Sequence, residues 1–577
     1  MTDQKHIWLD RYPPGVDWAM DVAKKPVFSM LQDTAQKYPS HPAFDFLGKK
    51  YTWNDIHEAA QKLAKGLQDL GVKKGQNIGI FLPNSPYFVV SYYGILMTGA
   101  TVVNLNPLYA EDELSHLIED SEIDMVISLD LKMLHDKMSK MMQSTRLSRI
   151  IVCPFTEILP FPKNMLFPII KRGEMVAIET DKRILHFNDV IDNNGQVEIP
   201  DIDPMNDLAV LQYTGGTTGK PKGAMLTHYN IYANTMQAKT WFHQIKPGED
   251  KMLGVLPFFH VFAMTAVMNF SVVYGLEIIA LPRFDLKDAL KAIQKKKPTL
   301  FPAVPAIYSA INNSPLRDKY DLSSLKYCLS GGAPLPVEVK RKFEEKTGCV
   351  VTEGYGLTES SPVACANPIE GENKPGSIGF PFPGTIIEIV DREDIVDANN
   401  PYDRATMMPI GERGELCIRG PQVMKGYWKK PDETAYTLRH TGEGDMRLHT
   451  GDVAIMDEDG YVFIVDRIKD MIITNGYNVY PRNVEEAIYK HPSIEECIVA
   501  GLPDEQRGEI VKVWIKLREG RELTQDDLKD FLKDKISPME IPKRFEFRDE
   551  PLPKTMIGKL SRKDILAEEL KEKGGSA

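Results

Sequence analysis

The spacing of apolar residues changes several times along the chain. After Thr52 they recur every three or four positions, which predicts a helix that Thr52 caps and Gly71 ends. The short run Asn77–Pro83 is typical of a buried strand. The predicted helix carries its apolar face at Ile56, Ala60, Leu63 and Leu67.

Similar apolar runs return further along, and most are separated by amphipathic stretches such as Leu286–Lys297. Strand–helix alternation predicts an α/β fold with layered, largely parallel sheets and covering helices. Ligands of such sheets bind in loops at the carboxyl ends of the strands. The runs are Asp124–Leu129, Arg149–Cys153, Leu208–Thr214, Leu276–Leu281, Pro298–Val304 and Leu325–Gly331.

The pattern changes near Asp466. Beyond it we expect a short helix, two or three strands and a further helix over Thr524–Lys535. This order predicts a large N-terminal body of several subdomains, residues 1–466, joined by a short hinge to a small α+β domain, residues 467–577.

Residues 154–173 form an unusual insertion, with four prolines, many large apolar residues and then basic ones. Two interpretations stay open. The segment is either a surface loop packed on the body or a contact patch for a membrane surface or a partner.

Composition narrows the class of protein. The chain has 577 residues, 42% of them hydrophobic and 26% charged. This length exceeds that of a single core. Its net charge of -11 argues against a dedicated nucleic-acid binder. Six scattered cysteines favour free thiols in a reducing cytosol. No signal peptide and no membrane-spanning run is recognised, so we expect a cytoplasmic protein, at most peripheral on the inner face of the cell membrane.

The stretch Leu211–Leu226, "LQYTGGTTGKPKGAML", combines threonines, glycines and lysines after a predicted strand. Backbone N–H groups, hydroxyls and a cation are what nucleotide phosphates require. The stretch fails the P-loop pattern, because Thr214 stands where a glycine is needed and Pro221 follows Lys220. Taken alone, it is a phosphate-binding loop or a flexible turn.

Four further stretches carry polar residues of the same kind. They are Tyr327–Pro336, Glu353–Ser360, Leu448–Ile472, with Asp452 in a predicted turn, and Pro553–Arg562, with Lys559 in a loop. In this order and spacing the five motifs resemble the acyl-adenylate-forming superfamily of acyl-CoA synthetases, luciferases and peptide-synthetase adenylation domains. The resemblance runs from about Phe28 to Lys563. The stretches "LPFFHVFAM" and "LPFPKN" are most similar to bacterial long-chain fatty-acid–CoA ligases.

The resemblance implies an ATP site built from three groups of residues. Thr214 and Glu359 would sit at Mg²⁺, which favours oxygen ligands. Asp452 and Arg467 would contact the ribose. The phosphate loop would be Thr214, Gly215, Gly216, Thr217, Thr218, Gly219 and Lys220. The adenine slot would be Gly331, Gly332, Ala333, Pro334, Tyr355, Gly356, Leu357 and Thr358.

The resemblance also implies a mobile C-terminal domain. Lys559 would approach the substrate carboxylate and the α-phosphate and neutralise their charge. Lys469 would be the hinge, and the path of the CoA thiol would be lined by Gly476, Tyr477 and Asn478.

The nature of the acid is indicated by Leu253–Gly275, which contains no acidic residue. The ammonium group of an amino-acid substrate would be left unpaired there, whereas the apolar chain of a fatty acid would be favoured. We expect one face to line a fatty-acyl pocket, through Phe258, Phe259, Phe262 and Met264. His260 either gates the carboxylate end, as a catalytic residue, or is a satisfied core histidine.

These features predict a long-chain fatty-acid–CoA ligase. Acid and MgATP would give acyl-AMP and pyrophosphate, and CoA would then give acyl-CoA and AMP. The alternatives are an acyl-AMP ligase that loads a carrier protein, a CoA ligase for medium-chain or aryl acids, and a non-catalytic acyl-binding protein. Chain-length preference and oligomeric state stay open, with a homodimer one option.

Overall fold

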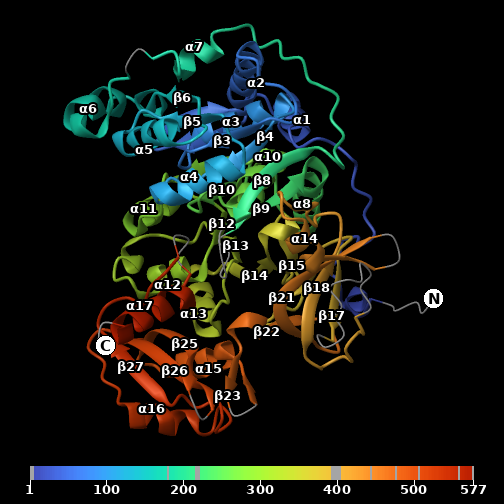
Figure 1. Ribbon diagram of the computed structural model, residues 1–577, viewed down its shortest axis with the longest axis vertical. Helices are drawn as coiled ribbons and strands as arrows, with labels where there is room; N and C mark the ends of the chain where they lie inside the picture. Colours follow the sequence, from blue (N-terminus) through green and yellow to red (C-terminus); the bar gives the residue numbers. More distant parts are fainter. Residues whose placement is uncertain are drawn as a thin grey trace.

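A computed structural model describes residues 6–178, 181–214, 221–391, 405–441, 445–474, 477–504, 507–555 and 559–574. Within these residues the strands form four sheets, three in a large body and one in a small C-terminal domain (Figure 1). No helix in the described residues is both long enough and apolar enough to cross a bilayer.

The first sheet contains the phosphate-loop strand. Six neighbouring strands, from β8 to β7 in the order given below, run parallel. The two strands at the other end of the sheet, β9 and β19, pair antiparallel. The order is β19 (Gly426–Tyr427), β9 (Lys222–Thr227), β8 (Leu208–Thr214), β4 (Thr101–Asn104), β3 (Asn77–Ile80), β5 (Met125–Leu129), β6 (Arg149–Cys153) and β7 (Ile184–His186).

The second sheet has a parallel centre with antiparallel strands at both edges. The order is β16 (Phe380–Pro381), β15 (Val363–Ala366), β14 (Val350–Gly356), β13 (Tyr327–Ser330), β12 (Leu300–Ala303), β10 (Lys251–Gly254), β11 (Glu277–Ala280), β1 (Pro42–Phe46) and β2 (Lys49–Thr52). The predicted layered, largely parallel α/β body is therefore confirmed for these two sheets.

The helices of the body form as the sequence pattern predicts. Thr52 caps α2 through a capping box with Asp55, and Gly71 takes a positive φ just beyond its end. Helix α3 is buried along its whole length, as expected for a helix with apolar residues on all sides. The body helices are α1 (Ser29–Lys37), α2 (Trp53–Asp69), α3 (Pro86–Met97), α4 (Glu111–Asp120), α5 (Lys132–Ser144), α6 (Lys163–Ile170), α7 (Phe187–Ile191), α8 (His228–Trp241), α9 (Val261–Ala263), the π-helical η4 (Met264–Asn269), α10 (Phe270–Tyr274), α11 (Leu286–Lys296), α12 (Pro305–Asn313), α13 (Val337–Thr347) and α14 (Pro431–Thr437).

The third sheet is antiparallel, unlike the other two. The predicted turn at Asp452 is wrong: Asp452 lies inside a long strand, at a bulge where Gly451 has φ +73°. A bulge carries the same glycine signal as a turn but lets the strand continue. The strands are β17 (Ile386–Val390), β18 (Gly414–Arg419), β21 (Met446–Met456) and β20 (Leu438–His440), with β22 (Val462–Arg467) paired to β21.

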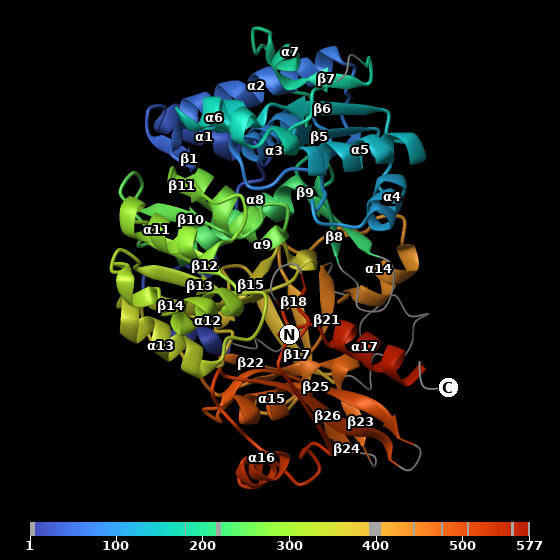
Figure 2. The same cartoon turned by 90° about the vertical axis from the view of Figure 1, so that its left-hand side faces the viewer.

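The C-terminal domain has a core of its own, centred on Val499, Val513 and Leu528. Figure 2 shows its sheet below the body, with helices on both sides. The elements are β23 (Ile472–Thr474), β24 (Tyr477–Val479), α15 (Pro481–Tyr489), β25 (Ile494–Asp504), β26 (Gly508–Leu517), α16 (Gln525–Leu532), β27 (Arg544–Arg548) and α17 (Arg562–Gly574).

Candidate nucleotide and acyl site

The polar site lies at the carboxyl ends of β13 and β14. The predicted adenine segment Gly331–Pro334 follows β13, and Tyr355–Thr358 begins with the last two residues of the adjacent parallel strand β14. Gly332 has φ +81°, and a Cβ there would lie 3.3 Å from Cε of Lys559. The structure therefore brings the predicted C-terminal lysine against the predicted adenine slot, and Gly332 leaves room for its side chain.

Asp452 forms a compact cluster with two other predicted residues. The hydroxyl of Tyr355 donates to Oδ2 of Asp452 at 2.5 Å, and Nε of Arg467 lies 3.1 Å from Oδ1. Burial, and then the Asp452 carboxylate, raise the pKa of Tyr355 well above its ordinary value, so the phenol stays a donor. Asp452 and Arg467 also face each other as cross-strand partners in β21 and β22.

Glu359 has a partner that the sequence did not reveal. It lies in the 3₁₀ turn Thr358–Ser360 and accepts a hydrogen bond from the hydroxyl of Tyr427 at 2.6 Å. Nζ of Lys222 pairs with Glu433 and lies 5.2 Å from the centre of the Tyr427 ring. Tyr427 is 68 residues from Glu359 in sequence, and no local pattern connects the two.

Thr214 is the last described residue before a gap. It ends β8, and its Oγ1 lies 3.5 Å from the carbonyl oxygen of Lys222. The remainder of the predicted phosphate loop, 215–220, lies outside the described residues, as does Gly476.

The pKa values of Lys559 and His260 are both lowered in this site. Burial, and then the positive charge of Arg467, lower the pKa of Lys559 to about 8, while Asp452 opposes this shift. Burial, and then Lys559, lower the pKa of His260 to about 4, so this imidazole is neutral at pH 7. Nδ1 of His260 accepts from the N–H of Phe262 at 3.4 Å and caps α9. His260 therefore lies close enough to the site to sense Lys559.

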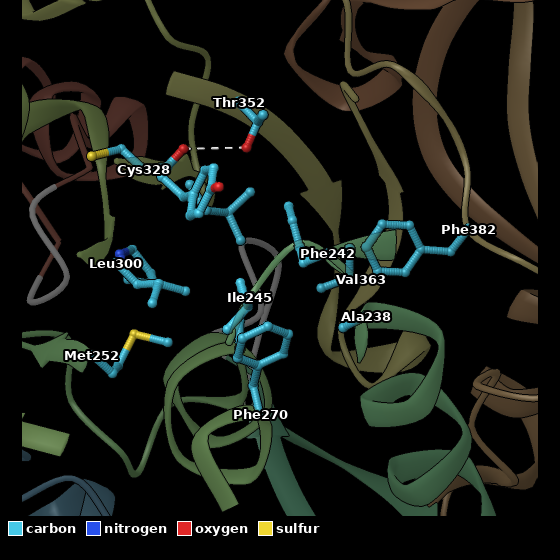
Figure 3. Close-up of a pocket in the computed structure, with 14 residues that line it drawn as sticks. Ala238, Phe242, Ile245, Met252, Phe270, Leu300, Cys328, Thr352, Val363 and Phe382 are labelled. Carbon is cyan, nitrogen blue, oxygen red and sulfur yellow. Dashed lines mark hydrogen bonds between the residues drawn. The ribbon is translucent and has the colours of Figure 1, made fainter. Parts of the chain in front are cut away.

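An apolar cavity lies between the second sheet and helices α8, η4 and α10 (Figure 3). Its volume is about 30 Å³, enough for only a small molecule such as water, so the lining side chains would have to move apart to admit an acyl chain. Thr352 turns its hydroxyl to the carbonyl of Cys328 at 3.2 Å. Of the described residues that line the cavity, none is charged. The others are Ala238, Phe242, Ile245, Met252, Ala266, Phe270, Leu300, Pro302, Tyr327, Leu329, Val363 and Phe382.

The cavity and the polar site share two strands. Leu329 and Thr352 line the cavity on β13 and β14, and Gly331 and Tyr355 follow them by two and three residues. The cavity and the polar cluster therefore lie along the same two strands.

The four predicted acyl-pocket residues are distributed around this region. Phe262 packs against Gly331, where a Cβ would lie 3.0 Å from its ring. Phe258 instead joins a core cluster, with its ring 6.3 Å from Phe44. The carbonyl of Phe259 accepts from Gln212, and the sulfur of Met264 lies 3.5 Å from Nδ2 of Asn104. Two cavity residues, Ala266 and Phe270, lie in the stretch Leu253–Gly275 that was expected to line the pocket. The others were missed because they come from many separate elements.

The predicted hinge lies near this cluster, whereas Tyr477 and Asn478 of the predicted thiol path belong to the C-terminal sheet. Lys469 is in the 3₁₀ turn Ile468–Asp470, directly after β22. Burial lowers its pKa, and the charge of Arg467 adds to the effect. Tyr477 and Asn478 are exposed on β24, at the edge of the C-terminal sheet.

This fold and this site define an AMP-binding enzyme, and the chain belongs to that family. The family described as "AMP-binding enzyme" matches residues 31–428, and "AMP-binding enzyme C-terminal domain" matches residues 483–559.

Individual relatives are similar over nearly the whole chain. The long-chain-fatty-acid–CoA ligase of Bacillus subtilis (strain 168) is 47% identical over 573 residues, 99% of each chain. That of Escherichia coli O6:H1 is 34% identical over 572 residues, 97% of this chain and 98% of its own. Among solved structures, ATP-bound MatB from Rhodopseudomonas palustris has a TM-score of 0.80 at 26% identity, over 95% of this chain and 99% of that one.

Proposed function

We propose that the protein is a long-chain-fatty-acid–CoA ligase, which forms acyl-CoA, AMP and pyrophosphate from a fatty acid, ATP and CoA. The observation that carries the proposal is the uncharged cavity, which shares β13 and β14 with the cluster of Asp452, Arg467 and Lys559. The curated relatives named above support a long-chain acid as the substrate.

In the first half-reaction an oxygen of the acid's carboxylate attacks the α-phosphate, and pyrophosphate leaves. A carboxylate resists attack by a thiol because it is already an anion, and the acyl–phosphate anhydride removes that barrier. Lys559 would neutralise charge between carboxylate and phosphate as the bond forms. Asp452 and Arg467 would hold the ribose, Tyr355 would stack on the adenine, and His260 would stand at the carboxylate end of the acyl pocket.

Thr214 and Glu359 offer a hydroxyl and a carboxylate, the oxygen donors that Mg²⁺ prefers. This donor set fits the ion. When bound, Mg²⁺ would neutralise charge on the phosphates. Tyr427 would hold the Glu359 carboxylate in place.

In the second half-reaction the thiol of CoA attacks the acyl carbon and AMP leaves. We place the domain boundary between residues 466 and 467 and the hinge at Lys469. A swing about it would withdraw Lys559 and bring Gly476, Tyr477 and Asn478 to the site. CoA as acceptor is preferred to a carrier protein because both relatives are CoA ligases by name. We further propose that the enzyme works in the cytoplasm, held peripherally at the inner face of the cell membrane.

A cavity-filling variant tests the substrate. Ala266→Phe places a ring in the cavity, so we expect the chain-length profile of thioester formation, measured from butyrate to arachidate, to move to shorter acids. The wild type should favour long chains, and the variant should keep its activity on short ones. Preference of the wild type for an aryl or medium-chain acid, or for a holo-carrier protein over CoA, would overturn the proposal.

A further inference from the structure

Helix α6 turns apolar side chains toward solvent. With the residue before its cap, it exposes five large apolar side chains, and it has no buried residue among its eight. The exposed fractions are 79% for Phe161, 62% for Met165, 45% for Leu166, 74% for Ile169 and 70% for Ile170. Soluble surfaces rarely gather such residues without an interaction partner.

The opposite side of the helix fixes this orientation. Asn164, Phe167 and Pro168 follow the i, i+3, i+4 spacing of one helical face and are partly buried. The Phe167 ring packs 5.0 Å from that of Phe155 on the body. Nζ of Lys163 donates to the carbonyl of Leu47 at 3.3 Å. The helix is therefore attached to the body by one apolar face while it displays another.

Basic residues flank the exposed face. Lys163 lies at the start of α6, and Lys171 and Arg172 follow its end; all three are exposed. Residues 154–174 hold these three basic residues and two acidic ones, Glu157 and Glu174, and Nζ of Lys171 pairs with Glu174 at 2.5 Å, in a chain whose net charge is -11. Apolar side chains surrounded by cations are complementary to the surface of an anionic bilayer.

We propose that this α6 patch, the five exposed apolar residues with Lys163, Lys171 and Arg172, docks on the surface of an anionic lipid bilayer. The helix would lie in the interfacial plane, with Phe161, Ile169 and Ile170 among the acyl chains and the basic residues at the headgroups. A two-fold contact between two copies is disfavoured, because it would bring the basic residues of both copies together.

The position of the patch suits an enzyme that takes its substrate from a membrane. In Figure 1, α6 lies near the end of the molecule opposite the C-terminal domain, so docking leaves that domain free to move. This reading of the patch rests on the proposed function, since long-chain acids partition into bilayers, but the docking itself is measured separately from catalysis.

Co-sedimentation of the full chain with phosphatidylcholine vesicles, with and without phosphatidylglycerol, tests the proposal. The wild type should sediment with anionic vesicles, less so at high salt. The double variant Ile169→Ser/Ile170→Ser should lose vesicle affinity on the order of tenfold or more. Lys171→Gln/Arg172→Gln should lose the preference for phosphatidylglycerol. The matched control, Val337→Ser/Leu570→Ser, removes two exposed apolar residues elsewhere and should bind as the wild type does.

Thioester formation with octanoate, a soluble acid, reports folding and catalysis independently. The patch variants should keep this activity, so loss of docking with retained turnover supports the patch. Three results would overturn it: no sedimentation of the wild type, equal sedimentation of the patch and control variants, or a change in oligomeric state of the patch variant on gel filtration. The last would show a contact between copies or with another protein.

Discussion

Single side chains set the conditions under which the first half-reaction can run. Lys559 is useful as a cation, yet burial and the nearby Arg467 lower its pKa to about 8. The amine therefore loses its proton as the pH rises through 8 in the free enzyme, and its charge is present below that value. The proposed catalytic lysine, Lys559, therefore lies where its charged form is disfavoured until the anionic substrates bind.

The pH dependence of adenylation follows from this shift. We expect kcat/KM for ATP–pyrophosphate exchange to be level below about pH 8 and to fall about tenfold per unit above it, since this ratio reports the free enzyme. Lys559→Arg keeps the charge at all these pH values, so its residual activity should lack that falling limb. A wild-type profile that stays level well above pH 8 would contradict the assignment.

In the proposed mechanism, Tyr427 acts on the reaction through Glu359. Tyr427→Phe removes the 2.6 Å hydrogen bond to the carboxylate and keeps the ring near Lys222. Hydrogen bonds to charged groups contribute about 1.5–3 kcal/mol, so adenylation should fall roughly ten- to hundredfold. The Mg²⁺ concentration needed for half-maximal rate should rise. Tyr436→Phe, at an exposed tyrosine nearby in sequence, is the control, and an equal effect there would argue against the role.

At the scale of elements, the bulge in β21 is what delivers Asp452 to the site. Gly451 has φ +73° and donates its N–H to Oε1 of Glu415 at 3.0 Å. Open space surrounds the position where a Cβ would be, so conformation alone requires glycine here. The buried Glu415 side chain thus holds the strand in the shape that aims Asp452.

Gly451→Ala tests the bulge. The left-handed conformation should cost about 1–2 kcal/mol of stability, measured by urea unfolding, and relaxation of the bulge should raise KM for ATP several-fold. Gly384→Ala is a matched control, because Gly384 has φ +69° and equally open surroundings but lies away from the site. It should show the same loss of stability with an unchanged KM.

The elements themselves were largely predictable, because the signals that define them are local. The capping Thr52 and the glycine at 71 delimit α2, and short apolar runs became β3, β5, β6, β8 and β13. The antiparallel third sheet was not predicted, since pairing depends on partners far away in sequence. The same reason hid Tyr427, which meets Glu359 only in three dimensions. Most of the cavity was missed because strands and helices from residue 238 to 382 each supply no more than three side chains.

The whole molecule has Lys559 beside Gly332, which in the proposed mechanism is the arrangement for adenylation. Direct contacts join the two domains in this state. The guanidinium of Arg413 lies 5.0 Å from the centre of the Tyr480 ring, and Nη1 of Arg518 donates to Oδ1 of Asn313 at 3.0 Å. These contacts belong to one arrangement of the domains and would break in a swing about Lys469.

Weakening the two contacts should therefore affect the half-reactions unequally. Each contact contributes roughly 0.5–1 kcal/mol at an exposed site, so Arg413→Ala/Asn313→Ala should slow acyl-AMP formation about five- to thirtyfold. Thioester formation from supplied acyl-AMP should be unchanged or faster. Arg183→Ala, which removes an exposed ion pair within the body, should change neither step. Equal loss in both half-reactions would contradict the two-conformation mechanism.

The cross-strand pairing of Asp452 and Arg467 has a consequence for the fate of the intermediate. Both residues belong to the antiparallel third sheet, which extends to Arg467, one residue past the proposed domain boundary, and Lys469 follows two residues later. Rotation of the C-terminal domain about Lys469 would leave this pair intact. The two residues would therefore still hold the ribose after Lys559 has moved away. The enzyme should then keep the acyl-adenylate bound between the two half-reactions. Acyl-adenylate should be released into solution, where it would hydrolyse, far more slowly than it reacts with the thiol of CoA.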